Sequence, residues 1–207
     1  MSDLFCPATM LVARHADAEY GHPHRLSDEG GWLTDKGREQ ARALAESLRG
    51  RRVARAFTST MQRAVESAAV AAEVLGVGVV ELDGLEEFSV GALAGRDFDD
   101  PELESVHNAW RNGDLGQLIP GGETGEQVVA RYREALQEIA DLHRGETVLV
   151  FSHGGVMSFV LPRIATPVRR DLLEREFLPH CEPAEVEVDA DGYRVLSWPG
   201  TSDRAVV

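Results

Sequence analysis

The stretch Thr9-Met10-Leu11-Val12-Ala13-Arg14-His15-Ala16 decides the fold class of this 207-residue chain. Residues 9–13 carry no charge and are mostly aliphatic, which is typical of a strand that is buried on both faces. Arg14 and His15 follow where that strand would end. In parallel α/β sheets, ligands bind at the carboxyl ends of the strands. We therefore expect the functional residues at this edge of the sheet.

The rest of the chain alternates strand patterns with helix patterns. Further strands are predicted at residues 53–58, 77–82 and 147–151, and a closing hairpin at 186–198; the 147–151 strand is apolar throughout and should be central. Thr34 is predicted to cap a helix that ends near Gly50, and Ser59 or Thr60 the helix that ends at Gly76. Thr124 and Gln127 form a capping-box pattern before a long amphipathic helix. This order predicts a three-layer α/β/α sandwich with a mostly parallel central sheet.

Length and composition favour a single domain over residues 1–207, because 43% apolar residues can supply one well-covered core. The segment from about residue 85 to 122 is irregular, apart from a short helix that Asp100 and Pro101 would start. We expect this segment to act as a lid over the site. The sequence gives no indication of the oligomeric state.

The formal net charge of -14 argues against a nucleic acid or an anionic membrane as partner, since both require a broad basic surface. A small anionic ligand would instead need a local basic pocket. Cys6 and Cys181 lie far apart and have neither disulfide-framework nor zinc-site spacing. With no signal-peptide pattern and no apolar segment of about 18 residues, a cytoplasmic location is expected.

Two arginines and two histidines are predicted to meet at the strand edge: Arg14, His15, Arg63 and His153. Arg63 falls in a first helical turn, where the helix dipole disfavours a cation unless an anion lies between them. The glycines at 154 and 155 allow the backbone to approach a ligand closely. Such a pocket suits a phosphate dianion, and a neutral imidazole can attack it. Phosphoryl transfer depends on positioning and charge neutralisation, so neither a metal nor another cofactor is required.

Six ordered motifs resemble those of the histidine phosphatase superfamily, also called the phosphoglycerate-mutase-like family. They are Arg14-His15-Ala16, residues 33–41, residues 59–64, the set Leu85, Glu87, Gly91 and Gly95, residues 121–124, and Ser152-His153-Gly154-Gly155. One stretch departs from the pattern: residues 17–21 replace a segment in which a Thr and an Asn often contact phosphate. The resemblance implies the phosphoglycerate-mutase-like fold.

The resemblance also implies roles for individual residues. His15 would accept the phosphoryl group, His153 would contact it, and Glu87 would be the general acid for the leaving oxygen. Arg14, Arg63 and the backbone at Gly154 would bind the phosphate. Glu86 is an alternative to Glu87 as the acid. Glu123 would hold Arg14 or Arg63 in position, or would only be a favourable acid before a helix start.

The favoured function is a cofactor-free phosphatase that hydrolyses a small phosphorylated metabolite through a phosphohistidine at His15. A mutase is the close alternative; the short chain and the modest 85–122 segment, which should admit water, favour the phosphatase. A phospho-ligand-binding module without catalysis is a second alternative. A third alternative is a metal hydrolase built on His15, Asp17, His22, His24 and Asp28. If they bind no metal, His22 and His24 could line the entrance of the site. The identity of the substrate is not encoded in these motifs.

Overall fold

The computed structural model describes residues 6–22, 24–173 and 178–200. Its main sheet has six strands in the order β5-β4-β6-β1-β7-β8. Their bounds are β1 Ala8–Arg14, β4 Val53–Thr58, β5 Val79–Glu81, β6 Thr147–Ser152, β7 Pro183–Asp189 and β8 Gly192–Ser197. Strands β5, β4, β6 and β1 run parallel, whereas β7 is antiparallel to β1 and to β8. The predicted mostly parallel sheet and the closing hairpin are therefore confirmed.

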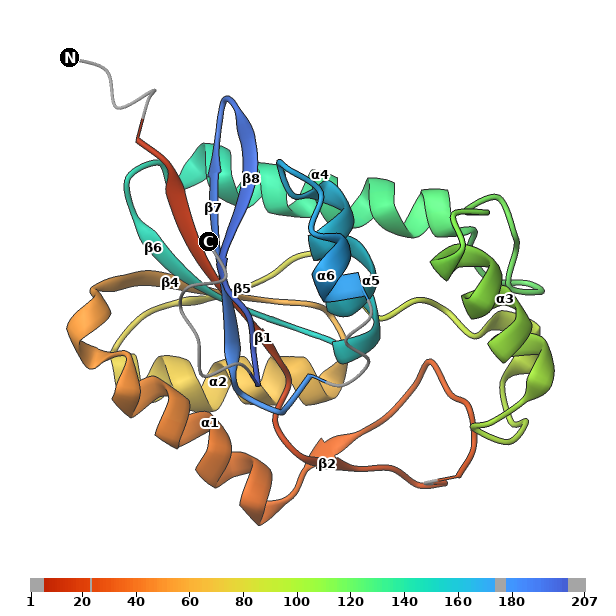
Figure 1. Ribbon diagram of the computed structural model, residues 1–207. Coiled ribbons are helices and arrows are strands. Elements are labelled where there is room, and N and C mark those ends of the chain that lie inside the picture. The colour runs from red at the N-terminus through yellow and green to blue at the C-terminus, as the bar shows by residue number, and fades with distance from the viewer. Residues whose placement is uncertain (1–5, 23, 174–177, 201–207) are drawn as a thin grey trace.

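Helices cover both faces of this sheet (Figure 1). One face carries α1 and α2, the other carries α4 and α5, and α3 lies beyond the end of the sheet. The helices are α1 Asp35–Ser47, α2 Gln62–Leu75, α3 Pro101–Arg111, α4 Gly125–Leu142, α5 Gly154–Ile164 and α6 Arg170–Leu173. A separate pair of short strands, β2 Ala18–Glu19 and β3 Trp32–Leu33, was not predicted. The three-layer α/β architecture is the predicted one.

The alternation of side chains along β1 explains its apolar sequence. Met10 and Val12 belong to the core cluster that includes residues of α4 and α5, and Leu11 and Ala13 belong to the cluster with α1 and α2. All four are at most 2% exposed. A strand that is covered on both faces needs an uninterrupted apolar run, because every side chain enters a core. None of the helices within the described ranges is long and apolar enough to cross a lipid bilayer.

The register of the sheet brings the ends of three strands together. Arg14 of β1 pairs with Ser152 of β6, and Thr58 of β4 pairs with Phe151 of β6. The residues that follow continue the pairing: the His15 backbone N–H donates to the Ser152 carbonyl at 2.8 Å. As a result His15, Ser59 and His153 emerge at one edge of the sheet, as the sequence predicts for His15 and His153.

Several local predictions are confirmed. The Thr34 hydroxyl caps α1 by accepting a hydrogen bond from the Gly37 N–H at 3.0 Å. Thr124 and Gln127 form the expected capping box of α4. Asp100 caps α3, with Pro101 at its first position, and Gly76 ends α2 in the left-handed conformation with φ of 70°. Glycine is favoured there because it has no side chain to clash.

The predicted cap of α2 is wrong. Met61 is the N-cap residue and makes no side-chain cap hydrogen bond. The Ser59 hydroxyl is bonded to the His153 ring instead, and the Thr60 hydroxyl donates to Glu86. The predicted 77–82 strand is also shorter than expected: only Val79–Glu81 pair, at the exposed edge of the sheet. The cap differs because tertiary contacts, which local sequence patterns do not encode, engage the hydroxyl groups of Ser59 and Thr60.

Candidate active site

His15 lies directly after β1 and is only 4% exposed. Its Nδ1 atom is 2.8 Å from the carbonyl oxygen of Ala16, and its Nε2 atom is 3.2 Å from Nε of Arg63. A carbonyl can only accept a hydrogen bond and a guanidinium can only donate one. Both contacts therefore require the same tautomer, with the proton on Nδ1 and a lone pair on Nε2.

The surroundings of His15 keep its imidazole neutral. Burial lowers the pKa of His15 well below its usual value, and the positive charge of Arg63 lowers that pKa further. The hydrogen bond to Ala16 acts in the opposite direction but is a smaller effect. At neutral pH the Nε2 lone pair is thus available for attack on an electrophile.

Arg63 contacts this lone pair, and Arg14 is close enough for its positive charge also to lower the pKa of His15. Arg63 is 6% exposed in the first turn of α2, and its Nη1 donates to the Gly30 carbonyl at 3.1 Å. Arg14 donates through Nη1 to the Leu178 carbonyl at 2.9 Å. Burial lowers the pKa of Arg14, and the charge of Arg63 contributes to this lowering. A doubly charged anion between the two guanidinium groups would relieve this repulsion.

His153 is the N-cap residue of α5 and is 1% exposed. Its ring centroid lies 5.3 Å from that of His15, and its Nε2 is 2.7 Å from the Ser59 hydroxyl oxygen. Among the described residues, its buried Nδ1 has no hydrogen-bond partner. Burial, followed by the charge of Arg63, lowers the pKa of His153 well below its usual value. The ring is therefore neutral, and its Nδ1 has hydrogen-bonding capacity that the described residues do not use.

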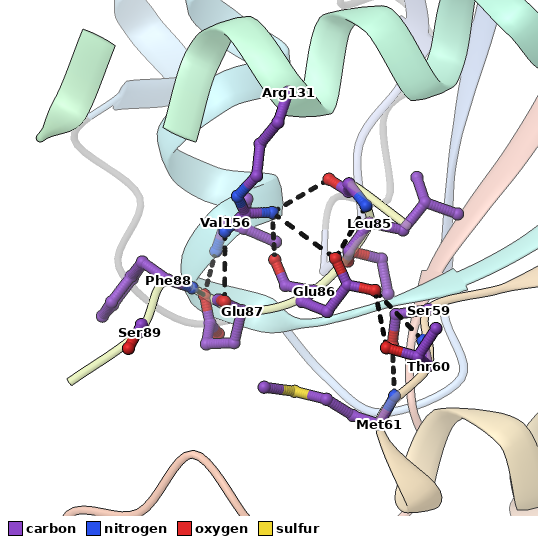
Figure 2. A network of polar contacts seen from close by, with 12 residues as sticks. Ser59, Thr60, Met61, Leu85, Glu86, Glu87, Phe88, Ser89, Arg131 and Val156 are labelled. Atoms are coloured by element: carbon purple, nitrogen blue, oxygen red, sulfur yellow. Dashed lines mark hydrogen bonds and ion pairs between the residues drawn. The ribbon is translucent and has the colours of Figure 1, made fainter. Parts of the chain in front are cut away.

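Glu87 and Glu86 point in different directions (Figure 2). The Glu87 carboxylate accepts hydrogen bonds from the backbone N–H groups of Gly155 at 2.8 Å and Val156 at 2.6 Å, at the start of α5. The Glu86 carboxylate accepts from Thr60 and from the Gly84 N–H instead. Burial raises the pKa of Glu87, which favours its protonated form. Of the two carboxyl groups, Glu87 is the one at the turn that follows His153.

With this geometry established, comparison with known proteins places the chain in a family. The family model described as histidine phosphatase superfamily (branch 1) matches residues 10–201. The chain belongs to the histidine phosphatase superfamily. The resemblance of its six motifs is thus confirmed at the level of the family.

Individual relatives of the chain differ in the activity that their names give. It is 30% identical over 195 residues to a probable phosphoglycerate mutase of Photorhabdus laumondii, covering 91% of this chain and 89% of that protein. It is 31% identical to a metal-independent phosphoserine phosphatase of Arabidopsis thaliana, covering 75% and 68%. The chain spans 52% of a bifunctional protein of Mycobacterium tuberculosis, at 34% identity over 90% of this chain. The solved structure of Bacillus stearothermophilus YhfR matches with a TM-score of 0.76 and 25% identity, covering 95% and 98%.

Two adjacent glycines make room for Arg14 and Glu87 in this histidine phosphatase. A Cβ atom on Gly154 would lie 3.1 Å from Cδ of Arg14. A Cβ atom on Gly155 would lie 2.7 Å from Oε1 of Glu87 and 2.7 Å from Cε1 of Phe88. The sequence predicts that these glycines let the backbone approach a ligand closely. The structure adds a different reason, because each glycine allows a neighbouring side chain to enter the site.

Replacing Gly155 by alanine is therefore expected to displace the Glu87 carboxylate. We expect a loss in kcat/KM of about 10- to 100-fold for an alkyl phosphate, because small misplacements of a reacting group are costly. Gly50→Ala is the matched control, since a Cβ atom there meets nothing within 4 Å. Steady-state kinetics on both variants measures the effect. Equal kcat/KM values for the two variants would contradict the prediction that the position of the Glu87 carboxylate depends on Gly155.

The predicted partners of Glu123 need correction. Arg14 and Arg63 were the expected partners, but Glu123 forms an ion pair with Arg131 of α4. Its Oε1 accepts from Arg131 Nε at 2.6 Å, and its Oε2 accepts from Arg131 Nη2 at 3.0 Å. Glu123 therefore acts on α4 and on the 84–87 segment that Arg131 contacts.

Sequence reasoning missed two residues near the site, Arg131 and His180. The Nδ1 of His180 donates to the His15 carbonyl at 2.6 Å, and the two rings have centroids 5.4 Å apart. Nothing in the sequence around His180 indicates this contact. Arg131 did leave a signal, because it lies three residues after Val128 and four before Ala135, on the apolar face of its helix.

The other histidines do not gather at the site. His22 and His24 are exposed. The His107 ring packs edge to face against the Phe88 ring, with centroids 4.6 Å apart, and His143 forms a hydrogen bond with Glu146. Over residues 6–22, 24–173 and 178–200, no group of three or more His, Cys, Asp or Glu side chains could hold a metal ion.

Proposed function

We propose that this histidine phosphatase is a phosphoric monoester hydrolase that forms a phosphohistidine on Nε2 of His15. The observation that carries the proposal is the fixed tautomer of His15, whose Nε2 lone pair faces the Arg63 guanidinium. This arrangement pairs a neutral nucleophile with a cation that can neutralise phosphoryl oxygens. Residues 1–207 would act as one domain, with residues 85–122 as the lid.

The first step transfers the phosphoryl group to the protein. Arg14 and Arg63 bind the oxygens of the phosphate, and the free Nδ1 of His153 contacts one of them. Nε2 of His15 forms a bond to phosphorus while the bond from phosphorus to the ester oxygen breaks. Glu87 gives its proton to that oxygen, so that the leaving group departs as a neutral alcohol.

The second step returns the protein to its starting state. The Glu87 carboxylate takes a proton from water, and the water oxygen attacks phosphorus as the bond to Nε2 breaks. Inorganic phosphate leaves, with Glu87 protonated again and His15 neutral. Because arginine side chains supply the positive charge, the proposed reaction needs no metal ion, which assays with and without a chelator would test.

The substrate class that suits this site is a small phosphorylated metabolite. A cavity of about 340 Å³, in the size range of small-molecule sites, adjoins Glu87, but none of the residues proposed to bind phosphate lines it. Its lining consists of Asp28, Met61, Glu86, Glu87, Ser89, Glu123 and Arg131. Support for hydrolysis comes from the relative named as a phosphoserine phosphatase, whereas another is named as a probable phosphoglycerate mutase. We favour the phosphatase because the 85–122 segment consists of one α-helix, α3, one short 3₁₀ helix, Gly91–Leu93, and turns, which leaves a path for water.

The release of inorganic phosphate from a panel of phosphate esters tests this function. Burst release of the alcohol, followed by steady formation of free phosphate, is the expected result. Transfer between two positions of a sugar or glycerate phosphate without free phosphate would identify a mutase. Tight ester binding with no product of either kind would identify a binding module.

The pH dependence of the reaction follows from two shifted groups. Hydrolysis needs protonated Glu87 and neutral His15; burial raises the pKa of Glu87 and lowers the pKa of His15. Glu87 is protonated at pH values below its pKa, and His15 is neutral at pH values above its own. Activity on an alkyl phosphate should therefore fall as pH rises through the pKa of Glu87. The measurement is the ratio of kcat/KM between the parent and Glu87→Gln, on the same ester, across pH. A ratio that does not decline with rising pH would remove Glu87 as the acid.

A further inference from the structure

Arg131 uses every hydrogen-bond donor of its guanidinium. Nη1 donates to the carbonyl oxygens of Gly84 at 2.9 Å and Glu86 at 2.8 Å. Nη2 donates to the carbonyl oxygen of Glu87 at 3.1 Å and to Glu123, and Nε donates to Glu123 as well. These are all five N–H groups that an arginine possesses. Figure 2 shows Arg131 reaching from α4 to the segment that carries Glu87.

The carbonyls that Arg131 binds belong to one short segment, residues 84–87. This segment has no helical or strand pairing of its own to fix it. The carboxylate of Glu123 orients the guanidinium from the opposite side, and both side chains are less than a quarter exposed, at 22% and 23%. A planar fork with fixed donor directions therefore determines where the backbone of Glu87 lies.

Contacts on the other side of the segment lead to the phosphate-binding residues. The Ser152 hydroxyl, next to His153, donates to the Leu85 carbonyl at 2.7 Å. The Glu86 carboxylate accepts from the Thr60 N–H at 3.1 Å, just before the helix of Arg63. The segment is thus held between α4 and the strand ends, and Arg131 supplies the α4 side.

We propose that Arg131 is a positioning residue that sets the distance between the Glu87 carboxyl group and the phosphoryl group on His15. The inference rests on the proposed function, since it concerns the acid of that reaction. Arg131 acts through the backbone of residues 84–87 and does not itself touch the reacting atoms. Its loss should matter most where protonation of the leaving oxygen limits the rate.

Two esters separate this role from a merely structural one. A primary alkyl phosphate, such as glycerol 1-phosphate, requires a proton on its leaving oxygen, whereas 4-nitrophenyl phosphate has a leaving group that departs without one. Arg131→Lys keeps the positive charge, but its three N–H groups cannot replace the five donated hydrogen bonds to three carbonyls and to both oxygens of Glu123. Its kcat/KM should fall about 10- to 100-fold for the alkyl ester and less than about 3-fold for the aryl ester. Arg133→Lys, an exposed site on the same helix, is the matched control and should leave both rates unchanged.

A variant without the acid tests whether Arg131 acts through Glu87. In the Glu87→Gln background, Arg131→Lys should add less than about a 3-fold further loss on the alkyl ester, because coupled residues are non-additive. Glu123→Gln should reproduce the ester selectivity of Arg131→Lys in a weaker form, with circular dichroism confirming that each variant is folded.

The failures can be distinguished. Equal losses on both esters for Arg131→Lys, with selective loss for Glu87→Gln, would overturn the positioning role alone. Equal rates for the parent and Glu87→Gln on the alkyl ester would remove Glu87 as the acid and the positioning role with it. An absence of ester hydrolysis by the parent would overturn the proposed function itself.

Discussion

Replacement of His15 by alanine is expected to lower kcat/KM by at least about 10⁴-fold on every ester that the parent hydrolyses. The reason is the single lone pair that the structure places beside the arginines, on Nε2 of His15. His153 is not expected to take over this role, because its Nε2 is already hydrogen-bonded to the Ser59 hydroxyl, at 2.7 Å. Steady-state phosphate release measures the loss.

The control for His15→Ala is another histidine of the same chain. His143→Ala removes an imidazole that bonds to Glu146 at the far end of α4, and it should keep the activity of the parent. Thermal unfolding of both variants checks that the fold is intact. Retained turnover in a folded His15→Ala variant would remove the nucleophile from the proposed reaction.

Arg63→Lys is expected to lower kcat/KM by about 10²- to 10³-fold, the usual effect of losing one donor to developing charge. Arg63 contacts the His15 lone pair through Nε and the Gly30 carbonyl through Nη1, so its fork spans the place where the phosphoryl oxygens would lie. A lysine keeps the charge but has no planar fork that can hold two oxygens at once. The charge alone is therefore not expected to restore the rate.

Binding of inorganic phosphate gives a second measurement on the same variant. Phosphate should raise the unfolding temperature of the parent, because a ligand that binds only the folded state stabilises it. The rise should be much smaller in Arg63→Lys and unchanged in Arg42→Lys, an exposed arginine on α1. An equal rise in all three proteins would show that Arg63 does not bind the phosphate.

Strands buried on both faces were the most predictable part of the fold. The apolar runs of β1 and β6 indicate such strands. The parallel register then brings the residues that follow these strands to the same edge of the sheet. This is why the sequence predicts that His15 and His153 lie together although 138 positions separate them. Caps with a local hydrogen bond, at Thr34 and Thr124, were equally accessible.

The residues that sequence reasoning misplaced take part in long-range polar contacts. Thr60 has the composition of a helix cap, but Glu86 offers its hydroxyl a carboxylate and α2 starts without a side-chain cap. Glu123 was expected to contact Arg14 or Arg63, but it pairs with Arg131, because Glu123 directly precedes the N-cap of α4 and Arg131 lies in the second turn of that helix. Such choices depend on which side chains the fold brings together, which no local pattern contains.

The choice between Glu86 and Glu87 illustrates the same limit. Both follow Leu85, and composition alone does not separate them. The motif spacing of the family favours Glu87, and the structure turns that carboxylate toward the N–H groups of Gly155 and Val156. The role of Glu87 as the acid stays a prediction, which the Glu87→Gln variant tests.

Rapid chemical quench with a ³²P-labelled phosphate ester tests the central claim most directly. Within one turnover, we predict an acid-labile label on the peptide that contains His15, present in the parent and absent from His15→Ala. The label should form and decay at rates that account for steady-state phosphate release. A parent that releases phosphate without any such label, or a label that persists in His15→Ala, would contradict the account.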